Sequence, residues 1–100
     1  MDTNIYQLRS RVFLWQGLAA WHFLGIPKKY SGDIKQRFGG SARGWGSLPV
    51  SVTIGQTTWK TSIFPDKKSG MYLLPVKAAV RKKEGIFNKD EVAFTLKIQR

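Results

Sequence analysis

Few side chains in this sequence could carry out chemistry. Its 100 residues include one histidine, His22, and no cysteine. The composition therefore excludes a disulfide framework, a thiolate zinc site, a cysteine nucleophile and any metal site that needs two histidines. His22 lies between Trp21 and Phe23 in an apolar segment. This setting favours a partly buried structural histidine over a catalytic one.

The carboxylates are scattered along the chain. They are the six residues Asp2, Asp33, Asp66, Glu84, Asp90 and Glu91. Only Asp90 and Glu91 are adjacent, and neighbouring residues of a strand point to opposite faces, so we do not expect the carboxylate pair of a hydrolase. The spacing of His22, Asp33 and Asp66 does not require a Ser-His-Asp arrangement. We therefore expect no enzyme, no cofactor and no metal site.

Residues 39–47 form a glycine-rich segment that could bind phosphate. Backbone amides beside glycines can cradle a phosphate, and Arg43 could supply the counter-charge. The segment lacks the Lys-Ser/Thr pair of a Walker motif and the third glycine of a dinucleotide-binding loop, so a flexible connection is the alternative interpretation. Trp45 either covers the mouth of the fold or is presented to a ligand, for example by stacking on single-stranded nucleic acid. The remaining tryptophans, expected in the core, are Trp15, Trp21 and Trp59.

Positive charge is in excess along the whole chain. Seventeen Lys and Arg against six Asp and Glu give a formal net charge of +11. Residues 1–50 hold seven basic and two acidic residues (+5), and residues 51–100 hold ten and four (+6). The excess belongs to the fold rather than to a tail, which indicates either a solvated surface or a face that binds a polyanion. The candidate contacts to an anion or a nucleic acid are Arg43, Trp45, Lys60, Lys67, Lys68, Arg81 and Lys82.

Hydrophobic periodicity predicts six strands. Apolar and polar residues alternate at 6–14, 50–54, 59–63 and 92–98, as in half-buried strands. Shorter apolar runs at 19–26 and 71–74 are each followed by a proline, which ends a strand. Residues 55–56 and 65–70 are expected to be turns.

Two short helices are expected between these strands. In the first, Ser31 is the expected N-cap, Asp33 lies in the first turn and Gly39 supplies a left-handed stop. This helix should bury Ile34 and Phe38, which share a face.

The second helix is expected to end at Gly85, again in the left-handed conformation. Ala79 and Val80 should face the core. Ile86 should make the apolar contact that follows a glycine cap.

The two halves of the chain follow one plan. Residues 5–54 and 58–99 each contain a strand, a short strand ended by a proline, a short helix ended by a glycine, and a strand. Repeated units of this kind share one core. We therefore expect one domain, residues 1–100, mainly β, in which two ββαβ units form a closed barrel with a helix at either end. An internal repeat is consistent with a monomer.

Particular motifs resemble known families. Residues 74–86, LPVKAAVRKKEGI, followed by Asp90 and Val92, resemble the signature of AbrB/MazE-type swapped-hairpin domains, although Lys89 stands where that pattern has a glycine. The whole chain is similar to the domain of unknown function 1905 family. That similarity rests on Trp21-His22-Phe23, Gly46 before Val50-Ser51-Val52, Trp59-Lys60-Thr61-Ser62-Ile63-Phe64 and Leu74-Pro75-Val76-Lys77. The resemblance implies a helix-capped double-split β-barrel and brings no catalytic residues.

These observations favour a non-enzymatic binding module that contacts nucleic acid through phosphates. One alternative is a barrel that binds a small molecule or anion, with Arg43, Trp45 and His22 as lining residues. A second alternative is a protein-interaction module. The longest apolar stretch, residues 17–26, is too short to span a membrane, and the absence of cysteine and of a secretory signal predicts a cytoplasmic protein.

Overall fold

A computed structural model describes residues 3–15 and 21–99 of the chain. Its strands are β1 (Ile5–Leu14), β2 (His22–Gly25), β3 (Leu48–Ile54), β4 (Thr57–Asp66), β5 (Met71–Pro75) and β6 (Glu91–Ile98). Its helices are α1 (Lys28–Phe38) and α2 (Ala78–Glu84), and two 3₁₀ turns, η1 (Gly39–Ser41) and η2 (Gly44–Gly46), follow α1.

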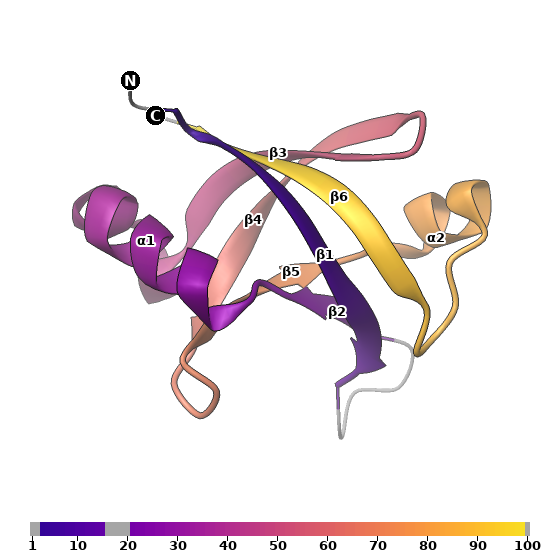
Figure 1. Cartoon of the computed structure of the whole chain (residues 1–100), viewed down its shortest axis with the longest axis horizontal. Helices are drawn as coiled ribbons and strands as arrows, with labels where there is room; N and C mark the ends of the chain where they lie inside the picture. The colour runs from indigo at the N-terminus through magenta and orange to yellow at the C-terminus, as the bar shows by residue number, and fades with distance from the viewer. Residues whose placement is uncertain (1–2, 16–20, 100) are drawn as a thin grey trace.

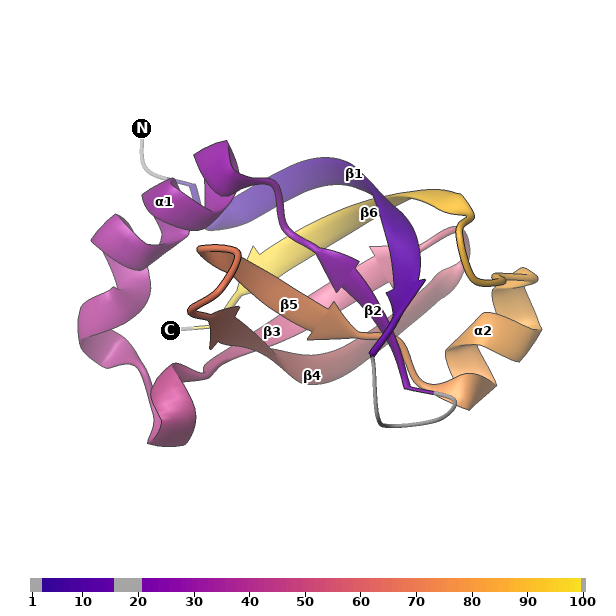
Figure 2. The same ribbon diagram turned by 90° about the horizontal axis from the view of Figure 1, so that it is seen from below.

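The six strands close into an antiparallel barrel in the order β1-β2-β5-β4-β3-β6. The two helices lie at opposite ends of this barrel (Figures 1 and 2). The prediction of a mainly β, closed barrel with two helices is therefore confirmed. Neither described helix is long and apolar enough to cross a membrane.

The barrel interior is filled by alternate residues of the strands, as the sequence pattern predicts. In β3 and β6 the side chains at every second position are buried, and those between them are exposed or half-buried. Fully buried side chains from several strands meet at the centre, among them Leu24, Ile63, Leu74 and Leu96. Burial of such side chains stabilises the fold by about 1.5–3 kcal/mol each.

The β3–β4 hairpin has the two-residue turn that the sequence predicts. Ile54 pairs with Thr57, which leaves Gly55 and Gln56 as the loop. Gly55 has a φ of 57°, and a Cβ atom there would displace the Glu84 carboxylate of α2. The left-handed backbone conformation is thus the reason for glycine at this position.

Helix α1 begins earlier than predicted. It starts at Lys28, directly after Pro27, and Ser31 lies inside the helix rather than capping it. The Ser31 hydroxyl is buried, donates to the carbonyl of Ile26 (2.7 Å) and accepts from the amide of Tyr72 (2.9 Å). The N-cap prediction was wrong because a proline already fixes the entry conformation and the serine is needed at the end of the β2–β5 ladder.

Two further expectations for α1 were wrong. Asp33 is not in the first turn, and its carboxylate instead accepts from the Tyr6 hydroxyl of β1 (2.7 Å) and from Arg37 (3.2 Å). Gly39 has a right-handed φ of −58°, because the chain tightens into η1 instead of reversing. The predicted burial of Ile34 and Phe38 is confirmed.

Helix α2 ends as predicted. Gly85 has a left-handed φ of 66°, and Ile86 is buried beyond it. Val80 is the buried residue of this helix, whereas Ala79 is exposed. The prediction for Ala79 was wrong because a helix of seven residues touches the barrel along one narrow face.

Candidate functional site

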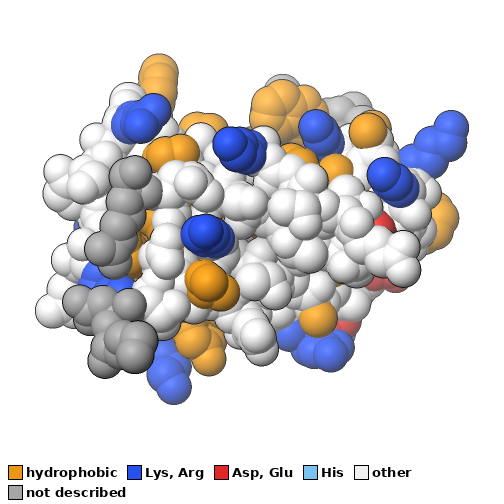
Figure 3. Space-filling model, turned by 90° about the horizontal axis from the view of Figure 1, so that it is seen from above, with side chains coloured by type: hydrophobic (Ala, Val, Ile, Leu, Met, Phe, Trp, Pro, Cys, Tyr) orange, Lys and Arg blue, Asp and Glu red, His pale blue; other side chains and the backbone are white. Residues whose placement is uncertain are grey.

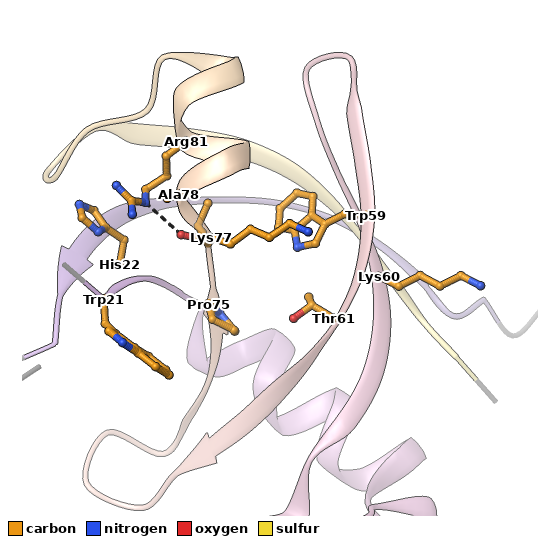
Figure 4. Close-up of a pocket in the computed structure, with 10 residues that line it drawn as sticks. Trp21, His22, Trp59, Lys60, Thr61, Pro75, Lys77, Ala78 and Arg81 are labelled. Atoms are coloured by element: carbon orange, nitrogen blue, oxygen red, sulfur yellow. Dashed lines mark hydrogen bonds between the residues drawn. The ribbon is translucent and has the colours of Figure 1, made fainter.

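A cavity opens where β4 and β5 diverge. The two strands pair at Phe64↔Leu73, Pro65↔Tyr72 and Asp66↔Met71. Beyond these pairs β4 continues beside β3, whereas β5 pairs with β2 and then leads into α2. The space between the diverging strands is a cavity of about 340 Å³ (Figure 4).

We call this space the β4–β5 cavity. Its walls combine basic, aromatic and small side chains. They are Trp21, His22, Trp59, Lys60, Thr61, Pro75, Val76, Lys77, Ala78 and Arg81. Within the described part of the chain, no carboxylate lines it. The cavity thus offers positive charge and indole surface to a ligand.

Arg81 is held against the cavity by α2. Its Nε donates to the carbonyl of Val76 (3.1 Å), which joins the helix to the segment after β5. In Figure 4 the guanidinium lies beside the ring of His22, and the Lys77 side chain extends toward Trp59. The amide of Val76 donates to the carbonyl of His22 (2.9 Å), so the same segment also positions β2.

The two indoles occupy different depths. Trp59 is 9% exposed and belongs to the core, whereas Trp21 is 55% exposed at the rim. The Trp21 ring lies 6.0 Å from that of Phe23, between centroids. The cavity therefore has an aromatic surface at its floor and another at its mouth, an arrangement that suits a flat or apolar ligand group.

Carboxylates elsewhere in the described chain are occupied by other contacts. Glu84 accepts from the hydroxyl of Thr57 (2.5 Å), and Asp66 accepts from the hydroxyl of Ser69 (2.7 Å). Glu91 forms an ion pair with Arg9 at 3.3 Å. Together with Asp33 on α1 and Asp90, which accepts from the amide of Phe87 at 2.8 Å, these contacts keep negative charge away from the β4–β5 cavity.

The shifted pKa values lie in other parts of the barrel. Burial, with the Asp33 carboxylate beside it, raises the pKa of Tyr6 to about 12. The Tyr6 hydroxyl in turn lowers the pKa of Asp33, and Arg37 acts in the same direction. Burial raises the pKa of Tyr72. The Tyr6–Asp33–Arg37 group joins β1 to α1.

At the comparable divergence of β1 and β2 a larger side chain stands in the place of Ala78. Tyr30 follows Pro27 by three residues, as Ala78 follows Pro75, and its ring packs edge-on against Tyr6 at 6.3 Å between centroids. Tyr30 is packed against the core, whereas Ala78 is exposed. The space beside Tyr30 is nevertheless a cavity, of about 530 Å³, so the two cavities differ in the side chains that line them and both are open.

The predicted site residues do not form one face. Lys60 and Arg81 line the β4–β5 cavity, although the Lys60 side chain projects away from it on the far side of β4 (Figure 4). Lys82 follows Arg81 in α2 and is exposed. Arg43 is followed by η2, and Lys67 and Lys68 are in the β4–β5 turn, which packs near α1. Figure 3 shows Lys and Arg dispersed among uncharged side chains on the face it presents.

Two of the four tryptophans are placed differently from expectation. Trp45 is 93% exposed, so of the two alternatives it is presented to solvent and does not cover the barrel. Trp15 and Trp21 are exposed rather than in the core, and Trp59 is buried as predicted. The sequence analysis did not select Trp21, Trp59 or Lys77 for the site. The order Pro75-Val76-Lys77 after a short strand was the only signal, and it does not reveal where neighbouring strands diverge.

Comparison with known proteins identifies the family. Among residues 3–15 and 21–99, no group of three or more His, Asp or Glu side chains could hold a metal ion. A comparison with curated proteins finds no match. The family described as Domain of unknown function (DUF1905) matches residues 9–96, the region that contains the β4–β5 cavity and most of every strand. The chain therefore belongs to the DUF1905 family.

Proposed function

We propose that this protein is a non-enzymatic binding module that takes an anionic ligand with a flat or apolar part into the β4–β5 cavity. The observation that carries the proposal is the meeting of Lys77, Arg81 and His22 with two indoles in a cavity that no described carboxylate lines. A volume of about 340 Å³ lies at the small end of the range of ligand sites. Apolar walls with a few convergent cations favour an organic anion over a bare inorganic one.

The non-enzymatic part of the proposal rests on the kinds of groups in the cavity. General acid–base or nucleophilic catalysis pairs a reacting group with a partner that activates or orients it. His22 shares the cavity with cations and a threonine hydroxyl, Thr61. These groups suit the binding of charge better than the transfer of a proton.

The test measures binding of phenyl phosphate, with inorganic phosphate as the comparison, by calorimetry and tryptophan fluorescence. Ala78→Tyr should place a ring in the cavity that Ala78 lines, and should lower affinity for phenyl phosphate at least tenfold. The matched control is Ala79→Tyr, because Ala79 is exposed on the same helix and does not line the cavity. Equal affinity in both variants would contradict the proposed site, and so would failure of the wild-type protein to bind any aromatic phosphate, sulfonate or carboxylate.

Nucleic-acid binding is the second candidate, and Trp45 favours it. Its indole is 93% exposed and its backbone has a φ of 64°, a conformation that costs a bulky residue energy. Arg43 is close in sequence, and Lys67 and Lys68 lie at the same end of the barrel, near α1. A ring held in solvent beside cations could stack on an unpaired base.

Gel shifts with single-stranded DNA and RNA at low and moderate salt test this candidate. Retardation should weaken steeply with salt and with Trp45→Ala. If micromolar protein retards neither nucleic acid, nucleic-acid binding is excluded as the function.

The proposal takes the barrel to be a double-split barrel built from two ββαβ repeats. Exchanging β1 with β4, β2 with β5 and β3 with β6 leaves the order of neighbours unchanged, which supports this origin. Such an arrangement within one chain resembles a dimer of AbrB/MazE type and favours a monomer. The absence of cysteine supports a cytoplasmic location.

A further inference from the structure

One edge of β4 has no neighbouring strand over much of its length. Residues Thr57–Ile63 pair with β3 on one side. On the other side, pairing with β5 begins only at Phe64. In the described part of the chain, seven consecutive residues of β4 therefore have one strand neighbour instead of two.

The register shows which main-chain groups face this open edge. In a hairpin with a two-residue loop the residues that flank the loop, Ile54 and Thr57, form a hydrogen-bonded pair, and such pairs alternate along the ladder. Trp59 and Thr61 therefore bond to β3. The N–H and C=O groups of Thr58, Lys60 and Ser62 point away from β3, toward the open edge.

Pro49 supports this assignment. It stands opposite Ser62 in the register and has no N–H to donate. Its carbonyl accepts from the amide of Gln99, on the β6 side of β3 (2.9 Å). Pro49 and Ser62 are thus a pair without mutual hydrogen bonds, and the main chain of Ser62 is left facing outward.

The open edge borders the β4–β5 cavity. Lys60 and Thr61 belong to both, and Lys77 and Arg81 lie on the facing wall. An exposed strand edge is a template for an added strand, which gains affinity from main-chain hydrogen bonds and specificity from neighbouring side chains. The side chains available here are mostly cationic.

The positive charge of the chain favours an acidic partner at the open edge of β4 over a second copy of the chain. A second copy would bring another net charge of +11 and another Lys60 to the same place, and like charges across a strand pair are destabilising. An acidic segment would be attracted by Lys60, Lys77 and Arg81. Lysine on an edge is also a common device against pairing with the wrong strand.

We propose that the ligand is an acidic, extended peptide segment that adds to β4 by pairing with the main chain of Thr58, Lys60 and Ser62 and places an apolar side chain in the β4–β5 cavity. This inference rests on the proposed function, since it names the partner of the same cavity. It explains why a cavity for one ligand group adjoins an open edge of several residues.

The probe is a seven-residue peptide that alternates Glu and Val, acetylated and amidated at its ends. Its affinity is compared with that of two analogues, one N-methylated at alternate residues and one with Lys in place of Glu. We expect both changes to lower affinity at least tenfold, the first through lost main-chain hydrogen bonds and the second through repulsion. Hydrogen exchange should slow at the amides of Thr58, Lys60 and Ser62.

A variant of the protein distinguishes peptide binding at the open edge of β4 from ligand binding in the β4–β5 cavity. Ser62→Pro removes one outward N–H at a position that does not line the cavity, and proline is tolerated on strand edges. It should keep the fold, by circular dichroism, and keep phenyl phosphate binding, while peptide affinity falls. If the N-methylated peptide binds as well as its parent, or only phenyl phosphate binds, the edge inference is overturned and the cavity proposal stands. If neither peptide nor aromatic anion binds, the proposed function itself fails.

Discussion

Replacing Ser31 with alanine should destabilise the barrel strongly, although a helix cap would predict a small effect. The hydroxyl is 2% exposed and makes two hydrogen bonds, to the carbonyl of Ile26 and from the amide of Tyr72. The amide of Ile26 already donates to the carbonyl of Tyr72 (2.8 Å), so Ser31 completes the ladder where β2 gives way to α1. Alanine would leave one buried acceptor and one buried donor without partners.

Each such unsatisfied group costs about 1–3 kcal/mol, so the two together lower the free energy of unfolding by about 2–6 kcal/mol. Loss of an N-cap costs about 1 kcal/mol. For a chain of this size even the lower bound, a loss of about 2 kcal/mol, corresponds to a fall in Tm of roughly 8–16 °C. Urea denaturation followed by tryptophan fluorescence measures the difference.

Ser31→Asn distinguishes the two roles of Ser31 further. Asparagine caps a helix as well as serine does, so a capping role predicts no loss. Ser31 is 2% exposed, and the longer asparagine side chain would move the polar atoms away from the Ile26 carbonyl and the Tyr72 amide, so the structure predicts a loss at least as large as that of Ser31→Ala. A loss of about 1 kcal/mol or less in the alanine variant, with a neutral asparagine variant, would refute the reasoning.

Two other predictions concern the backbone and the pH dependence of stability. Tyr6 has a pKa of about 12 in the fold against 10.0 ordinarily, so its contribution to the free energy of unfolding is fully present below pH 10.0 and is lost as the pH rises through about 12. In the wild-type protein the urea midpoint should therefore fall over that pH range, and Tyr6→Phe should make the fall smaller. An equal fall in both proteins would contradict the assignment. Lys89 is exposed with a φ of 76°, so Lys89→Gly should stabilise the protein by about 0.5 kcal/mol, because relief of left-handed strain exceeds the added entropy of the unfolded chain. Gly85→Ala, at a φ of 66° with open space around the new Cβ, is its control and should change stability in the opposite direction.

The strands were predictable because each carries its own signal. The alternation of apolar and polar residues in β3 and β6 can be recognised without knowing which strands lie beside them. The helix end at Gly85 and the turn at residues 55–56 can be recognised because glycine favours the left-handed conformation that each requires. The start of α1 was missed because Ser31 matches the local pattern of a cap while its bonds are to Ile26 and to Tyr72, a residue 41 positions away. A local pattern cannot show which of two valid uses the fold makes of a hydroxyl.

The β4–β5 cavity could not be predicted for a related reason. It exists because β4 and β5 pair at only three positions before β5 turns to β2, and this register depends on the packing of the whole barrel. Lys77 and Trp21 look like an ordinary surface lysine and a core tryptophan in the sequence. They become candidate ligand contacts only because β4 and β5 diverge beside them.

The net charge of +11 acts at this cavity through the placement of the acids more than through the number of bases. Each described carboxylate contacts a hydroxyl, an amide or an arginine elsewhere, and none lines the β4–β5 cavity. Lys77 and Arg81 therefore line a partly enclosed space to which no described carboxylate contributes, and charges in such a space attract an anion more strongly than charges at the open surface. The remaining bases are spread over the strands, helices and turns of the surface, where salt screens them. A basic composition in this fold is thus a reason to look for one anionic ligand at one place rather than for a uniformly basic face.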